Sequence, residues 1–258
     1  MLERTATMPT PSDDAERRIY PRPPIVEAII ELRYEGEVAP ELVLDALRDA
    51  LGTYNGDPRK QERIQFEAQV SGDTVQSSTK KLPDLTFLRT TDGLRQIGVA
   101  PGGISVHVLA PYPGWERFME QAHAAVQALP DVVRTGPVTA LGVRYIDRIT
   151  LPDSNVQRFL KVMPYRPTAM PTELSGFHVV TQTRDPMDGT LALLTIATGP
   201  PEADGKPSLI YDLNVRRVSD HLCTFADDAW MPIIEALHKR QREIFEDSIT
   251  DDLRELFQ

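Results

Sequence analysis

The sequence predicts an α+β protein made of two similar halves, and three observations carry this prediction. Each half opens with a run of alternating apolar and polar residues, the pattern of a half-buried strand. Each opening run is followed by a short helix, a series of further strands and a closing amphipathic helix. The dipeptides Asp92-Gly93 and Asp188-Gly189, which favour hairpin turns, stand in the first hairpin of the two strand series. We therefore expect helices on one face of a curved antiparallel sheet, or of two such sheets.

The first half is predicted to span residues 23–130, after a flexible polar tail at residues 1–22. Its opening strand covers residues 24–34, where every second residue from 26 onward falls on the apolar face. The run Asn55-Gly56-Asp57-Pro58 has the residue types of a turn. The remaining elements are a helix at 40–51, antiparallel strands between 63 and 109, and a closing helix at 115–129.

The second half, residues 131–258, repeats this order after a junction near Pro130 to Gly136. Asp227 or Asp228 is expected to cap its long closing helix, and Thr250 with the two acids after it a final short one. Its expected strands are at 138–149, 174–183, 190–198 and 208–217, and its helices are at 155–162, 229–247 and the C-terminus.

The two closing helices suggest that the halves arose by duplication. Trp115 and Trp230, the only tryptophans, stand near the starts of these helices. Glu120 and His123 align without gaps on Glu235 and His238, and helical packing alone does not require that match. Coincidence between two amphipathic helices is the simpler alternative. The order of elements is that of the TATA-binding-protein and helix-grip folds, an analogy of topology that implies no shared function.

The expected core combines the apolar faces of both halves. It is predicted to contain Ile30, Leu32, Phe66, Phe87, Val106, Trp115, Phe118, Val143, Val179, Leu193, Ile196, Leu213, Trp230, Ile234 and Leu237.

The composition excludes several classes of protein. The chain has 258 residues, 41% of them hydrophobic, and a formal net charge of −10, which disfavours a general nucleic-acid binder. A single cysteine, Cys223, excludes an internal disulfide and a multi-cysteine zinc site. No apolar run approaches the ~18 residues of a membrane span, and the N-terminus lacks a hydrophobic signal region. The expectation is a cytoplasmic protein that makes no use of a membrane.

Arginine and tyrosine pairs near the ends of the two opening strands are the candidate ligand-binding residues. They are Arg33 with Tyr34 and Arg144 with Tyr145, and Arg148 shares a strand face with Arg144. Two guanidinium groups on one face can grip a carboxylate or phosphate. If the opening strands meet at a pseudo-twofold axis, these pairs are expected to converge there. The competing interpretation is that the arginines pair with cross-strand acids on a solvated face.

The sequence predicts no catalytic residue, metal site or cofactor. It contains no Gly-x-Ser-x-Gly elbow, no P-loop and no Gly-x-Gly-x-x-Gly. The histidines lack the spacing of a zinc site, and His221 with Cys223 is half a metal motif without a second half. His123 and His238 are expected to be packed helix residues.

The opening and closing segments carry a family resemblance. The run Pro-Pro-Ile-Val-Glu-Ala-Ile-Ile-Glu-Leu-Arg at residues 23–33 resembles the opening signature of a sporadically distributed bacterial and archaeal family of uncharacterised proteins about 260 residues long. The stretch at residues 238–257 is also similar to that family, so the resemblance covers residue 20 to the end. It implies no catalytic residues, and the scattered distribution implies mobile-element or defence-type gene neighbourhoods.

Three function classes follow from these patterns. The leading hypothesis is a non-enzymatic interaction or binding module, whose partner is another protein or a second copy of the chain. The alternative is a ligand-binding protein or enzyme that handles a small anion with the strand-borne arginines and tyrosines. The least favoured is a nucleic-acid binder that uses residues 134–184, where seven Lys or Arg stand against three Asp or Glu.

Overall fold

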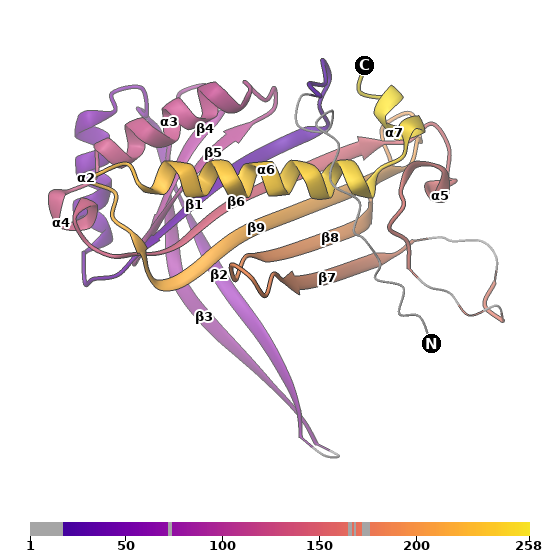
Figure 1. Ribbon diagram of the computed structural model, residues 1–258, viewed down its shortest axis with the longest axis horizontal. Helices are drawn as coiled ribbons and strands as arrows, with labels where there is room; N and C mark the ends of the chain where they lie inside the picture. The colour runs from indigo at the N-terminus through magenta and orange to yellow at the C-terminus, as the bar shows by residue number, and fades with distance from the viewer. Residues whose placement is uncertain (1–17, 72–73, 165–166, 168, 172–175) are drawn as a thin grey trace, which may run out of the picture.

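The chain folds into one open antiparallel sheet of nine strands, with six helices in the part of the chain that the structure describes (Figure 1). This computed structural model describes residues 18–71, 74–164, 167, 169–171 and 176–258. The strands are β1 (Ile25–Tyr34), β2 (Gly56–Ser71), β3 (Thr74–Arg89), β4 (Arg95–Ala100), β5 (Gly103–Leu109), β6 (Val138–Thr150), β7 (His178–Arg184), β8 (Leu191–Gly199) and β9 (Ser208–Cys223). The helices are α2 (Pro40–Ala50), α3 (Trp115–Gln127), α4 (Asp131–Arg134), α5 (Val156–Phe159), α6 (Trp230–Ser248) and α7 (Asp251–Glu255). The predicted α+β class is confirmed.

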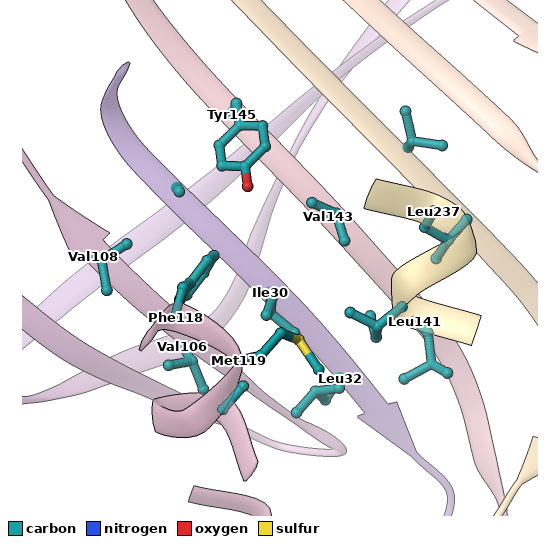
Figure 2. Close-up of a cluster of buried hydrophobic side chains, with 14 of the residues drawn as sticks. Ile30, Leu32, Val106, Val108, Phe118, Met119, Leu141, Val143, Tyr145 and Leu237 are labelled. Carbon is teal, nitrogen blue, oxygen red and sulfur yellow. The ribbon is translucent and has the colours of Figure 1, made fainter. Parts of the chain in front are cut away.

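The two opening strands lie side by side at the centre of the sheet. The strand order is β2-β3-β4-β5-β1-β6-β9-β8-β7, and β1 runs antiparallel to β6 with Ile30 opposite Val143. The alternation seen in the sequence places Ile30 and Leu32 of β1 on the same face as Leu141 and Val143 of β6 (Figure 2). One large sheet therefore replaces the two that the sequence also allowed.

The long helices cover one face of this sheet. Helix α6 crosses β6 and β9, and α3 packs on β5 (Figure 1). Their apolar stripes supply Phe118, Met119 and Leu237, which meet the strand residues in the core (Figure 2). The opposite face of the sheet carries no helix in the described part of the chain.

Most of the predicted core residues are buried. Trp115 and Val179 are only half-buried, and Leu193 is 37% exposed because it lies on the uncovered face of β8. Phe87 is buried on that same face, where its ring meets the His107 ring edge-on at 5.2 Å. The side chain of Phe66 lies outside the described residues. Those confirmed are Ile30, Leu32, Phe87, Val106, Phe118, Val143, Ile196, Leu213, Trp230, Ile234 and Leu237.

Several element boundaries differ from the sequence predictions. Gly56 begins β2 opposite Arg89 and does not belong to a turn, because pairing with β3 extends to this residue. The junction between the halves contains α4, whose Val133 is buried. Strand β9 continues to Cys223, which pairs with Val138 of β6. At each of these positions, contacts with the rest of the fold determine the secondary structure, and the local sequence pattern does not.

The helix caps are partly as predicted. Thr250 caps α7, and its hydroxyl accepts a hydrogen bond from the Leu253 amide at 3.4 Å. The first residue of α6 is Trp230, and no side chain caps this helix. Asp227 instead accepts a hydrogen bond from the Thr224 hydroxyl at 3.1 Å, and Asp228 adopts a left-handed backbone with φ of 56°.

A long two-stranded ribbon projects from the sheet. Strand β3 pairs with β4 only over residues 86–89, so the rest of its length pairs with β2 alone. The ribbon extends well beyond the helices that cover the sheet (Figure 1). A two-stranded ribbon is only marginally stable by itself.

Replacing Gly56 with alanine is expected to destabilise the protein by about 1–3 kcal/mol. A Cβ at this position would lie 2.9 Å from the carbonyl oxygens of both Arg89 and Thr90, and neither backbone group can move away freely. Urea denaturation measures the change. Gly52→Ala is the matched control, because a Cβ there meets nothing within 4 Å. Equal free energies of unfolding for the two variants would show that the close backbone approach at Gly56 does not affect stability.

Candidate functional site

A pocket of about 620 Å³ opens where the N-terminal segment passes one end of α6. Residues 18–21 and 23–25 form one side, and residues 112–117, the loop before α3 and the first turn of that helix, form another. Strand β6 and helix α6 complete it with Tyr145, Asp147, His238 and Gln241 among other residues. Its volume is in the range of pockets that hold small organic molecules.

The period of each element explains which side chains reach the pocket. Along β6, alternate residues from Leu141 to Ile149 face the helices, so Tyr145 and Asp147 stand on that side. Figure 2 shows the Tyr145 side chain on the same face of β6 as Val143. On α6, residues 238, 241, 242, 245 and 246 share one face because they are three or four positions apart.

Aromatic rings form much of the wall. The Trp115 indole stacks on the His238 ring with centroids 3.6 Å apart, and its Nε1 donates to both carboxylate oxygens of Glu235 at 2.9 Å. The Tyr112 and Tyr145 hydroxyls lie 2.9 Å apart, in hydrogen-bond contact. The Trp115 contacts join the start of α3 to α6, and the tyrosine pair joins the loop before α3 to β6.

The ionisable groups of this wall are uncharged at neutral pH. Burial, with a smaller effect of the Arg242 charge, lowers the pKa of His238 to about 3. Burial raises the pKa of Tyr112 to about 12 and holds the pKa of Tyr145 well above its ordinary value. None of these three side chains has a pKa near 7, so none is suited to proton transfer at neutral pH. The wall instead offers a contact surface for an apolar or aromatic group.

Asp147 is the exception among these groups. Its side chain is 2% exposed, and its Oδ1 has no hydrogen-bond partner in the described residues. Burial, together with the nearby Asp212 carboxylate, raises the pKa of Asp147 to about 8. A buried acceptor without a donor is costly, so its retention in a pocket marks this residue as a candidate for ligand contact.

The N-terminal segment is fastened to the C-terminal end of the chain. The Tyr20 hydroxyl donates to Glu246 Oε1 at 2.6 Å, and Arg254 Nε donates to the other oxygen of that carboxylate at 2.8 Å. The Arg22 amide donates to the Phe257 carbonyl at 3.0 Å. Residues 18–21 of the predicted tail therefore line the pocket, and residues 1–17 lie outside the described part of the chain.

Arg33 and Arg144 are not brought together. They share the uncovered face of the sheet, but Arg33 is opposite Ala140 and Arg144 is opposite Ile29, four residue steps apart along the strands. Tyr34 points to the other face, where it is 3% exposed in the core. The convergence at a central axis that the sequence suggested is therefore not found.

Arg144 and Arg148 each have an acidic partner. Arg144 forms a two-pronged contact with Asp212 at 2.8 and 2.6 Å, and Arg148 Nε donates to Glu202 at 3.0 Å. The Arg144 contact matches the alternative of cross-strand ion pairs on a sheet face, whereas Glu202, the partner of Arg148, lies in the loop between β8 and β9. Of the five predicted ligand-binding residues, Tyr145 is the one that lines the pocket.

One residue of the sequence, Asp147, carries a local signal for the pocket. Asp147 is an acid at an apolar-face position of an otherwise regular strand, two residues after Tyr145 and two before Ile149. An acid in that register must be buried once the strand is covered. The pleat of the strand places it on the opposite face from Arg144 and Arg148.

The described residues contain no group of three or more histidine, cysteine or acidic side chains that could hold a metal ion. A search for membrane-spanning helices in the same part of the chain finds none of sufficient length and apolarity. Comparison with models of known protein families and with curated proteins gives no match.

Proposed function

We propose that the protein is a non-enzymatic binding module that holds a small organic ligand in the pocket beside α6. The observation that carries this proposal is the combination of a cavity of about 620 Å³ with a buried carboxyl group, Asp147, that no described residue satisfies. The aromatic wall is locked by its own hydrogen bonds and offers contact area to such a ligand.

A thermal-shift screen of the full chain tests this function. The panel contains aromatic amines, aromatic carboxylates and neutral aromatics, and ligands that bind the folded state raise the melting temperature. Ile25→Trp fills the pocket from its β1 side, and Val26→Trp changes the next residue, which does not line the pocket. We expect rises in the wild type and in Val26→Trp that are lost in Ile25→Trp. A panel without any rise, or rises that Ile25→Trp preserves, would contradict the proposal.

The small-anion alternative has weaker support. Arg144 and Arg148 are paired with Asp212 and Glu202, so an anion would have to displace a carboxylate from each. Arg33 is exposed and four steps away from Arg144. The structure offers no built anion site at these residues, which is why the pocket is preferred.

A protein partner, including a second copy of the chain, is the second candidate. The support is the β2–β3 ribbon, whose outer part has no third strand. Strand pairing along such an edge is a common mode of recognition. Native mass spectrometry of the purified chain separates the two candidates, because a retained small ligand adds its own mass and self-association doubles the mass of the chain.

We also propose that the sheet arose by duplication, with halves at residues 23–130 and 131–258 in the order of the TATA-binding-protein fold. In support, β5 beside β1 matches β9 beside β6, and each closing helix begins at a tryptophan. Adding 111 to the residue numbers of β1 gives the matching residues of β6, so that Arg33 matches Arg144 and Glu31 matches Gly142. Glu31 and Gly142 also lie opposite each other in the sheet, as expected at a pseudo-twofold axis between the two strands. Superposition of the halves tests this, and a misfit of Trp115 on Trp230 would refute it.

A further inference from the structure

The pocket lacks a hydrogen-bond donor for the buried carboxyl group of Asp147. Its strand neighbours are committed elsewhere: the Tyr145 hydroxyl contacts Tyr112, and the Tyr211 hydroxyl donates to Ser248 at 3.0 Å. Asp212, on the opposite face of β9, is held by Arg144. No described side chain therefore supplies a hydrogen-bond donor to Asp147 Oδ1.

The charged groups from the other elements around the pocket also have partners or lie at its rim. Glu246 of α6 accepts from Tyr20 and Arg254, and Arg242 of the same helix donates to the Arg18 carbonyl at 2.7 Å. The Arg18 guanidinium lies 3.8 Å from the Glu246 carboxylate, and the remaining charged lining residues, Glu116 and Arg117, are exposed at the start of α3. The missing partner of Asp147 is thus a donor that enters from outside.

We propose that the pocket binds an organic cation, a protonated amine on an aromatic or apolar body, with its charge on Asp147. This inference rests on the proposed ligand-binding function and names the ligand class. The ammonium group supplies the hydrogen-bond donor that the carboxyl group lacks, and the body lies against the aromatic wall, whose ring faces attract cations. The wall is formed by Tyr20, Tyr112, Trp115, Tyr145 and Phe245.

Two further features favour a cation over an anion. An anionic ligand would bring its negative charge close to the Asp212 carboxylate, whose charge already contributes to the raised pKa of Asp147. The net charge of −10 also attracts cations to the molecule as a whole.

Binding of the cation is expected to release a proton from Asp147. With the Asp147 pKa at about 8 before binding, this carboxyl group is mostly protonated at pH 7. Ionisation on binding then releases roughly 0.9 proton per ligand at that pH. The affinity rises with pH, by up to roughly tenfold per unit, and levels off above pH 8 while the amine keeps its own proton.

Three probes with one ring system and different head groups test the ligand class. They are 2-naphthylmethylamine, 2-naphthylmethanol and 2-naphthoate, titrated calorimetrically in buffers of different ionisation enthalpy. We expect the amine to bind at least tenfold more tightly than the alcohol, with proton release at pH 7. In Asp147→Asn the amine should lose at least tenfold in affinity together with the pH dependence, whereas the alcohol should be little affected.

The controls separate this inference from the proposed function. Asp49→Asn removes an exposed carboxylate on α2, far from the pocket lining, and should leave amine binding unchanged. If the alcohol or the naphthoate binds as tightly as the amine, and Ile25→Trp abolishes that binding, the pocket is a ligand site and only the cation inference fails. Amine binding that survives Asp147→Asn also overturns the inference. If no probe binds in a way that Ile25→Trp abolishes, both proposals fail.

Discussion

Replacing Trp230 with alanine is expected to lower the free energy of unfolding by about 3–5 kcal/mol. Trp230 is fully buried at the start of α6, where its ring meets Phe225 edge-on with centroids 6.4 Å apart. Its removal leaves a cavity beneath the helix that covers β6 and β9, and the sheet cannot collapse into that space. Guanidinium denaturation, followed by far-UV circular dichroism, measures the loss.

Two variants serve as comparisons for Trp230→Ala. Trp230→Phe keeps most of the apolar area and removes an indole N–H that has no partner in the described residues, so it should cost much less. Trp115→Ala removes the first residue of α3, which is only half-buried, and should also cost less. A loss at Trp115 as large as the loss at Trp230 would contradict this account of the core.

Replacing Asp147 with asparagine is expected to change the pH dependence of stability. The Asp147 pKa is about 8 in the folded protein and near 3.8 in the unfolded chain. The unfolded chain therefore ionises first as the pH rises. The stability contributed by the protonated group is fully present below pH 4 and is lost as the pH rises through 8.

The asparagine side chain does not titrate, so the variant escapes this loss. Its stability relative to the wild type should increase by roughly 1.4 kcal/mol per pH unit between pH 5 and 7. The ionisation penalty in the wild type is on the order of 4 kcal/mol at pH 7. Urea melts at several pH values measure the slope, and Asp49→Asn controls for the loss of one negative charge. Parallel curves for the wild type and Asp147→Asn would show that Asp147 ionises normally in the folded state.

The sequence was most informative about elements that carry their own period. The alternation through Ile30 and Leu32 and the stripe through Ile234 and Leu237 specify a strand and a helix without reference to the rest of the chain. Leu193 shows where this fails. The period says which residues share a face, but which face of β8 is covered depends on where α6 lies.

The candidate site could not be predicted in the same way. It forms where residues 18–25 meet α6 and the C-terminal residues, more than two hundred positions later, and no local pattern signals that contact. The proposed meeting of Arg33 and Arg144 depended on the register of β1 against β6, which the sequence leaves open. Tyr145 lines the pocket because it stands on the covered face of β6. Which residues of a strand share a face can be read from the local sequence, whereas the register between two strands cannot.

The central β1–β6 pair makes the two halves dependent on each other. If the chain were cut near Pro130, β1 and β6 would each present a long row of unpaired backbone amides and carbonyls to water. The contact of Trp115 with Glu235 and His238 would also be divided between the two fragments. Each fragment would thus lack the neighbouring strand that pairs with its central strand. Mixing the two fragments is expected to restore the β1–β6 pair and with it the sheet. The two halves therefore form a single cooperative unit, and the intact chain is expected to unfold in one transition.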